Sequence, residues 1–210
     1  MPTNLPILLT WLRILLIPLV VGVFYLPDAW LTGAEKNTTA TVIFVVAALT
    51  DWLDGWLARR WNQTSSFGAF LDPVADKLMV TAALLILLWL SRINVLIALV
   101  IIGREIAISA LREWMAQLGA GKSMTVHWLG KIKTIAQMVA IPMLLYDDWF
   151  FVFDSHFVGT RLIWIAALLT VWSMLYYMRR AYPKILARTR RPKRPRRFPR
   201  RVADSDPPQP

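Results

Sequence analysis

Four aspartates in one short stretch of the chain have the spacing of a shared binding site. The first two belong to a helical stripe at positions i, i+3, i+4 and i+7, which is made of Asp51, Asp54, Gly55 and Ala58. The other two, Asp72 and Asp76, are four residues apart and therefore lie one turn apart on the next helix. Because the connection between the two helices is short, we expect them to be neighbours and the four carboxylates to converge.

Converging carboxylates indicate metal-assisted phosphate chemistry. Clustered carboxylates do not all stay ionised unless a positive charge offsets their repulsion, and bound cations provide such a charge. Ligands that are all oxygen favour Mg²⁺ or Mn²⁺ over zinc, and a pair of such ions suits phosphodiester chemistry. Taken singly, the residues have structural explanations, since Asp72 before Pro73 could be a helix N-cap and Arg59 a membrane-flanking anchor.

The elements that position these residues are predicted to be membrane helices. Hydrophobic residues make up 57% of the 210 residues and charged ones 18%, against about 45–50% and about 25% in soluble proteins. The chain contains no cysteine, which excludes disulfides, thiolate catalysis and cysteine-based zinc sites. We expect an all-α integral membrane protein with six transmembrane helices: 5–26, 40–60, 74–90, 93–111, 131–146 and 159–178.

Basic residues predict the orientation of these spans. Lys and Arg are abundant in the connections that share a side with the termini and scarce in the others, so both termini are expected in the cytoplasm. Arg13 falls about two turns into the first apolar segment. We expect it either to extend to the membrane interface or to belong to a stretch that lies on the membrane surface.

The net charge of +11 belongs mostly to the C-terminal tail. Twelve of the 24 Lys and Arg residues lie between Arg179 and Arg201, in a segment rich in proline. The sequence therefore divides into a membrane domain, residues 1–186, and a basic tail, residues 187–210, that is expected to be disordered. Such a tail favours contact with anionic lipid, and nucleic-acid binding is not expected because stacking aromatics and a binding fold are missing.

The pattern D-x2-D-G-x2-A-R-x8-G-x3-D-x3-D, from Asp51 to Asp76, resembles the defining motif of the CDP-alcohol phosphatidyltransferases. Segments that begin at Asn4, Phe67, Gly103 and Gly130 resemble bacterial members that use sn-glycerol 3-phosphate as the acceptor. The resemblance implies transfer of a phosphatidyl group from CDP-diacylglycerol to glycerol 3-phosphate with release of CMP. It also implies a six-helix homodimer in the bacterial inner membrane, with its active site facing the cytoplasm.

The resemblance further implies roles for individual residues. Asp51, Asp54 and Asp72 would bind two divalent metal ions, and Asp76 would lie near the second ion and act as the general base. The expected contacts to CDP-diacylglycerol are Ile7, Leu8, Leu9, Thr10, Gly55, Ala58, Arg59, Ser65 and Gly68.

The acceptor is less strictly determined by the sequence. An acceptor that carries a phosphate needs cationic groups, and the candidates are Arg104, Arg112, Lys131 and Lys133. Arg112 shares a helix face with Glu105 and Ser109 and could instead belong to a structural network. Inositol phosphate, serine and phosphatidylglycerol are the alternative acceptors. A cation transporter is the alternative outside this chemistry, but its acids should lie nearer the middle of the bilayer on broken helices.

Overall fold

The computed structural model describes residues 5–61, 66–117, 128–150 and 152–189. Its helices are α1 (Leu5–Val23), α2 (Gly33–Trp61), α3 (Ser66–Trp89), α4 (Val95–Gln117), α5 (Trp128–Tyr146) and α6 (Ser155–Thr189). The expectation of a helical chain is confirmed. Two stretches, Gly33–Leu57 and Ser155–Tyr176, are long and apolar enough to cross a membrane, and Leu8–Val23 and Ile132–Tyr146 are shorter apolar helices.

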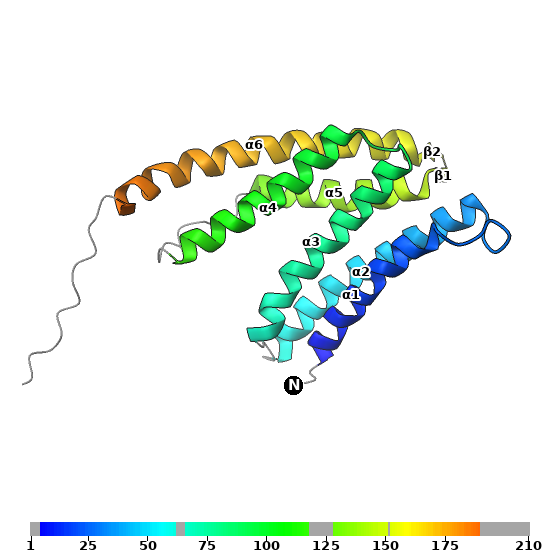
Figure 1. Cartoon of the computed structure of the whole chain (residues 1–210), viewed down its shortest axis with the longest axis horizontal. Helices are drawn as coiled ribbons and strands as arrows, with labels where there is room; N and C mark the ends of the chain where they lie inside the picture. The colour runs from blue at the N-terminus through cyan, green and yellow to red at the C-terminus, as the bar shows by residue number, and fades with distance from the viewer. Residues whose placement is uncertain (1–4, 62–65, 118–127, 151, 190–210) are drawn as a thin grey trace, which may run out of the picture.

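The helices form two arms that diverge from a common end (Figure 1). One arm consists of α1, α2 and α3, which pack against one another, and the other consists of α4, α5 and α6. Contacts of α2 with α5 and of α3 with α4 and α5 join the arms. We call the end that holds residues 24–32 and 90–94 the closed end. The opposite end of the first arm, where α1 and α3 begin and α2 ends, is the carboxylate end.

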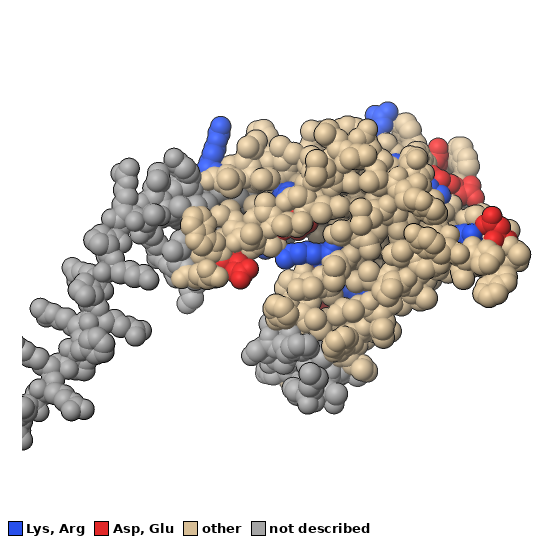
Figure 2. Space-filling model, viewed as in Figure 1, with Lys and Arg blue, Asp and Glu red and all other residues tan. Residues whose placement is uncertain are grey.

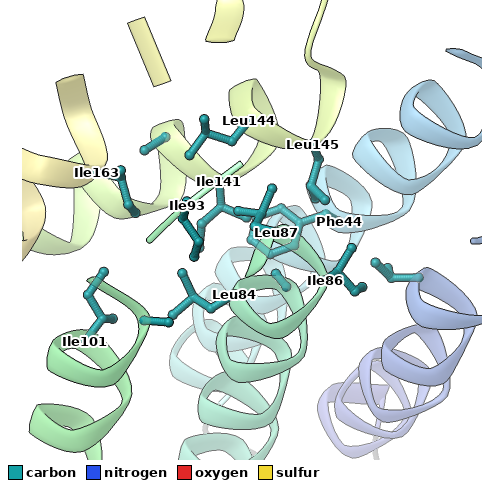
Figure 3. Close-up of a cluster of buried hydrophobic side chains, with 14 of the residues drawn as sticks. Phe44, Leu84, Ile86, Leu87, Ile93, Ile101, Ile141, Leu144, Leu145 and Ile163 are labelled. Atoms are coloured by element: carbon teal, nitrogen blue, oxygen red, sulfur yellow. The ribbon is translucent and has the colours of Figure 1, made fainter. Parts of the chain in front are cut away.

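A hydrophobic core holds the two arms together near the closed end. Its side chains come from all six helices and from the α1–α2 and α3–α4 connections, and those drawn in Figure 3 point toward one another. Fully or almost fully buried members are Phe44, Leu84, Leu87, Ile101, Ile141, Leu144, Leu145 and Ile163. At the α5–α6 contact, a Cβ added to Gly159 would lie 2.9 Å from the Leu144 side chain, so the glycine permits this close approach.

The helices that begin at the closed end have side-chain N-caps. Thr32 and Glu35 form a capping box at the start of α2, with the Thr32 amide donating to Glu35 Oε2 at 2.7 Å. Asn94 accepts from the Leu96 amide at 2.8 Å at the start of α4, and Asp154 accepts from the His156 amide at 2.9 Å at the start of α6. These caps satisfy amides that the helices themselves leave without acceptors.

Arg92 ties the two arms together at the closed end. Its Nη1 donates to the carbonyls of Leu144 and Leu145 at the end of α5, at 3.0 and 2.8 Å. Its Nη2 donates to Asn37 Oδ1 of α2 at 2.9 Å, and its Nε pairs with Asp147 at 2.9 Å. One guanidinium therefore connects α2, α5 and the α3–α4 connection.

Two features differ from the expectation of six plain spans. A short antiparallel pair, β1 (Trp149–Phe150) and β2 (Phe153–Asp154), connects α5 to α6. The helices α2 to α6 also extend beyond the expected apolar runs at one end or both, because an α-helix requires only continuous backbone hydrogen bonds, whereas α1 ends at Val23, before the expected end of its span. Since α3 already begins at Ser66, Asp72 and Pro73 lie within it, and the N-cap explanation of Asp72 is wrong.

The outer surface is apolar along all six helices. Large hydrophobic side chains with more than half of their surface exposed occur on every helix, among them Leu15, Val42, Leu85, Leu99, Ile135 and Leu168. Water-soluble monomers seldom expose apolar surface so extensively, whereas lipid tails are a suitable environment for it.

Candidate active site

The four aspartates of the motif lie at the carboxylate end of the first arm. Asp51 and Asp54 are on the last three turns of α2, and Asp72 and Asp76 are on the first three turns of α3. The helical spacing of the sequence therefore positions each pair, and the packing of α2 and α3 around α1 brings the pairs together.

A buried arginine from α1 joins three of these carboxylates. Arg13 Nη1 lies 2.8 Å from Asp51 Oδ1 and 2.6 Å from Asp76 Oδ1, and Arg13 Nη2 lies 2.6 Å from Asp54 Oδ2. The Arg13 side chain is 0% exposed. The expectation that Arg13 extends to the membrane interface is therefore wrong, because carboxylates inside the arm hold its guanidinium. The alternative, that the first turns of α1 lie on the membrane surface, stays a prediction.

Asp72, the fourth carboxylate, is held by a neutral group. Thr10 Oγ1 donates to Asp72 Oδ1 at 2.8 Å. Thr10 and Arg13 are three residues apart on α1, so one face of that helix contacts all four aspartates. We call Thr10, Arg13, Asp51, Asp54, Asp72 and Asp76 the carboxylate cluster.

The carboxylates differ in their access to solvent. The Asp54 side chain is 5% exposed, whereas that of Asp51 is 34% and that of Asp76 is 45% exposed. Among the three carboxylates around Arg13, Asp54 is thus the internal member, and Asp76 is the most open to an approaching molecule.

The donor atoms of this cluster suit a hard divalent cation. They are all oxygens, and three of the four carboxylates already surround a positive group. Within the described ranges no three acidic or histidine side chains form a ready-made metal site, since the guanidinium stands between the carboxylates. A single positive charge offsets only one of four carboxylates, so the cluster keeps the capacity to attract cations.

A second charged cluster joins the helices of the other arm. Glu105 of α4 pairs with Lys133 of α5 and, at 3.2 Å, with Arg104 Nη1. Arg104 Nη2 donates to Ser173 Oγ of α6 at 3.4 Å. Arg104 and Lys133 are both buried, and we call Arg104, Glu105 and Lys133 the basic cluster because it carries two cations for one carboxylate.

A hollow separates the two arms on the face shown in Figure 2, and Lys or Arg side chains border it. At the closed end, an apolar cavity of about 310 Å³ lies between α2, α5 and the strand pair. Its lining offers little for phosphate chemistry: Thr41, Pro142, Met143, Tyr146, Phe150, Phe153 and Ser155.

Comparison with known proteins identifies the family. The family model of the CDP-alcohol phosphatidyltransferases matches residues 3–172, which include both clusters. The chain belongs to this family. As a CDP-alcohol phosphatidyltransferase it is a transferase of phospholipid metabolism, and the resemblance noted from the motif is confirmed.

Three bacterial relatives illustrate the similarity. The chain is 50% identical over 192 residues to proteins of Escherichia coli (strain K12) and Shigella flexneri serotype 5b (strain 8401), and 48% identical to one of Salmonella choleraesuis (strain SC-B67). Each alignment covers 89% of this chain and 99% of the relative. All three relatives are named CDP-diacylglycerol–glycerol-3-phosphate 3-phosphatidyltransferase.

Of the residues expected to contact CDP-diacylglycerol, the structure brings Thr10 directly to the aspartates. Leu8 is exposed and Leu9 half-buried on α1, Gly55 is half-buried on α2, and Gly68 is buried in the first turn of α3. Ala58 and Arg59 lie on α2 and Ile7 on α1, but their side chains are not among the described ones; Ser65 lies outside the described residues.

Of the four acceptor candidates, the structure places two together in the basic cluster. Arg104 and Lys133 share Glu105, whereas Ser109 donates to the Glu105 backbone carbonyl at 2.7 Å. Arg112 is exposed and forms no ion pair with the described part of the chain, so the alternative that it belongs to a network with Glu105 is not supported. Lys131 lies on α5, and its side chain is not described.

Arg13 is a member of the site that was not predicted from the sequence. Its position inside an apolar segment was a signal, because an ionisable residue there generally has an interaction partner within the protein. Its partners are far from it in the sequence, with Asp54 41 residues away and Asp76 63 residues away, and the acids nearer in the sequence are not among them. Only the packing of α1 against α2 and α3 identifies these partners.

Proposed function

We propose that this chain transfers the phosphatidyl group of CDP-diacylglycerol to sn-glycerol 3-phosphate and releases CMP. The observation that carries the proposal is the convergence of four motif aspartates in a chain of this family. Relatives about 50% identical over nearly their whole length are named for this reaction, which supports glycerol 3-phosphate as the acceptor.

Two divalent ions, Mg²⁺ or Mn²⁺, are the proposed cofactors, with Asp51, Asp54, Asp72 and Asp76 as their ligands. Such ions stabilise the negative charge that develops on a pyrophosphate during substitution at phosphorus. The donor set is suitable because it consists of oxygens alone and lies where a positive group is already held.

Asp76 is proposed to accept the proton of the attacking hydroxyl. It is the most exposed of the three carboxylates around Arg13, so an acceptor can approach it. Its place on α3, beside Asp51 and Asp54 of α2, puts it next to the proposed metal ions. Removal of the proton by a positioned carboxylate makes the acceptor hydroxyl a better nucleophile as it attacks the lipid-side phosphorus.

The CDP moiety is proposed to lie along the stripe of Gly55, Ala58 and Arg59 on α2, with Ser65, Gly68 and the stretch from Ile7 to Thr10 nearby. Small residues leave room beside the carboxylates, and a guanidinium provides a fork for phosphate oxygens. The diacylglycerol tails would remain in the lipid that the apolar outer surface faces.

The basic cluster and its neighbours are proposed to receive the phosphate of the acceptor. Arg104 and Lys133 provide buried positive charge on α4 and α5, and Arg112 and Lys131 add to it. Glu105 holds the two buried cations in place. A phosphate that binds among buried, fixed cations gains more electrostatic interaction energy than one that binds to exposed cations.

The acceptor proposal predicts a selective effect of Arg112→Gln. The KM for glycerol 3-phosphate should rise about 10- to 100-fold, the range expected when one charge-assisted hydrogen bond to phosphate is lost. The KM for CDP-diacylglycerol should change little. Steady-state kinetics with each substrate varied in turn measures both values.

Glu113→Gln is the matched control for Arg112→Gln, because Glu113 is an exposed neighbour on the same helix. It should leave both KM values close to those of the wild type. An equal rise in the two KM values of Arg112→Gln would argue against a role in acceptor binding.

We propose that all six helices cross the bacterial inner membrane, with both termini and the carboxylate end on the cytoplasmic side and two copies forming a dimer. The distribution of Lys and Arg supports this orientation. In this arrangement both water-soluble molecules, glycerol 3-phosphate and CMP, exchange with the cytoplasm.

The orientation predicts opposite labelling of two cysteine variants. The chain has no natural cysteine, so Ala29→Cys at the closed end and Gln117→Cys at the end of α4 each supply one exposed thiol. In intact spheroplasts a membrane-impermeant maleimide should label Ala29→Cys and should label Gln117→Cys only after lysis. The reverse pattern would show that the orientation is wrong.

An acceptor panel tests the proposed function. Purified protein in mixed micelles with CDP-diacylglycerol should release CMP rapidly with glycerol 3-phosphate and slowly with serine, inositol phosphate or phosphatidylglycerol. If one of the other acceptors reacts faster, the family assignment stands, but glycerol 3-phosphate is not the preferred acceptor.

A further inference from the structure

Arg13 is the only charged residue of α1. It is completely buried, and its two terminal nitrogens contact carboxylates of two other helices at 2.6–2.8 Å. Its Nε, also buried, has no hydrogen-bond partner within the described residues. The guanidinium is therefore held through its aspartate contacts, at the cost of one unsatisfied donor.

The contacts of Arg13 use the oxygens that a divalent ion would require. Asp51 and Asp76 both contact the same nitrogen, Nη1, and Asp54 contacts Nη2. Asp72 is the exception because Thr10 holds it. A cation that binds Asp51, Asp54 and Asp76 meets the positive charge of Arg13 and competes with it for these oxygens.

We infer that Arg13 is a tethered counter-ion that takes the place of the divalent ions in the metal-free protein and is displaced from the aspartates when they bind. The inference rests on the metal site of the proposed function. In the metal-free protein Arg13 offsets part of the repulsion among the carboxylates and keeps the ends of α2 and α3 together against α1. It acts as a positioning residue, because its contacts are with the aspartates.

Thermodynamic linkage distinguishes this role from a purely structural one. A ligand stabilises the folded state by an amount that depends on its affinity for that state. Removal of a competing cation destabilises the metal-free protein and increases metal affinity, so the metal restores more stability to the variant than it adds to the wild type. By contrast, substitution of a residue that only supports packing should lower the stability of the folded protein by the same amount with and without metal.

The experiment measures thermal unfolding of the full-length protein in detergent, first in chelator and then across a titration of Mg²⁺. Arg13→Met, which keeps the apolar stem, should have a lower Tm than the wild type in chelator and should recover most of the difference in Mg²⁺. The Mg²⁺ concentration for half of the shift should fall about tenfold or more, because a competing charge within a few ångströms is removed.

Arg92→Met is the matched control. Arg92 is also a largely buried arginine with an aspartate partner, but it lies at the closed end, away from the carboxylate cluster. Its variant should lose the same stability in chelator and in Mg²⁺. Arg13→Lys provides a second comparison that keeps the charge but lacks the planar fork, and its half-shift concentration should lie between those of the wild type and Arg13→Met.

The outcomes separate the inference from the proposed function on which it rests. If Mg²⁺ stabilises the wild type, while both Arg13 variants respond with the same or a higher half-shift concentration, the counter-ion role is wrong and the metal site stands. If neither Mg²⁺ nor Mn²⁺ shifts the Tm of the wild type or of any variant, the metal site is wrong, and the inference with it.

Discussion

Asp76→Asn should reduce turnover by about 10²- to 10⁴-fold, the contribution typical of a general base. Asparagine has nearly the shape of aspartate but accepts no proton from the acceptor hydroxyl at neutral pH. Binding of CDP-diacylglycerol should be largely retained, because Asp51, Asp54 and Asp72 remain. Single-turnover CMP release and equilibrium binding of the lipid substrate measure the two effects separately.

The same substitution at Asp28 is the control for Asp76→Asn. Asp28 is an exposed carboxylate at the closed end, 2.6 Å from Lys36, and the hydrogen bond from Lys36 lowers the pKa of its carboxyl below the ordinary value. Asp28→Asn thus removes an ionised group far from the carboxylate end and should leave turnover unchanged. If Asp76→Asn loses lipid binding and metal affinity as strongly as turnover, Asp76 is chiefly a ligand.

Asp54→Asn should bring activity close to background and should raise the metal concentration required for the remaining turnover. Asp54 is the most buried carboxylate of the three around Arg13, so water replaces it poorly as a ligand. Loss of a residue that only hydrogen-bonds to a metal ligand typically lowers metal affinity by about 10–100-fold, and loss of a direct ligand should lower it further. Metal titrations of CMP release measure the change.

A folded protein is required for this comparison, because Asp54 is also a partner of the buried Arg13. The circular dichroism spectrum and Tm of Asp54→Asn in Mg²⁺ establish whether the helices persist. A folded variant with the metal dependence of the wild type would show that Asp54 is not a metal ligand.

The sequence was sufficient to predict the helices that carry the aspartates and the faces on which they lie. Those faces depend only on local spacing, because residues three or four positions apart lie on the same face of any α-helix. The short connection between α2 and α3 then made convergence of the pairs a reasonable expectation. The structure brings Asp51, Asp54 and Asp76 to a common partner.

Partner choice between distant helices could not be predicted in this way. Arg13 and Glu105 each had several candidate partners in the sequence, and packing decides among them. Glu105 pairs with Lys133 of another helix and with its neighbour Arg104, although helical spacing suggested Arg112. Salt bridges between helices depend on rotations and distances that no single helix determines.

Hydropathy also could not predict where the helices begin and end. Apolar runs indicate where a helix contacts lipid or core, but polar residues continue the same hydrogen-bonded backbone. The start of α2 at Gly33 is set by the Thr32–Glu35 capping box, seven residues before the expected apolar span. The strand pair between α5 and α6 is too short to give an alternating pattern.

The central claim is that the carboxylate cluster is a metal-dependent site for phosphatidyl transfer. The most direct test is CMP release by the purified full-length protein from CDP-diacylglycerol and glycerol 3-phosphate, after chelation and again after addition of Mg²⁺ or Mn²⁺. We predict no release above background in chelator and full recovery with either metal. Release at the full rate in a verified metal-free preparation would contradict the claim.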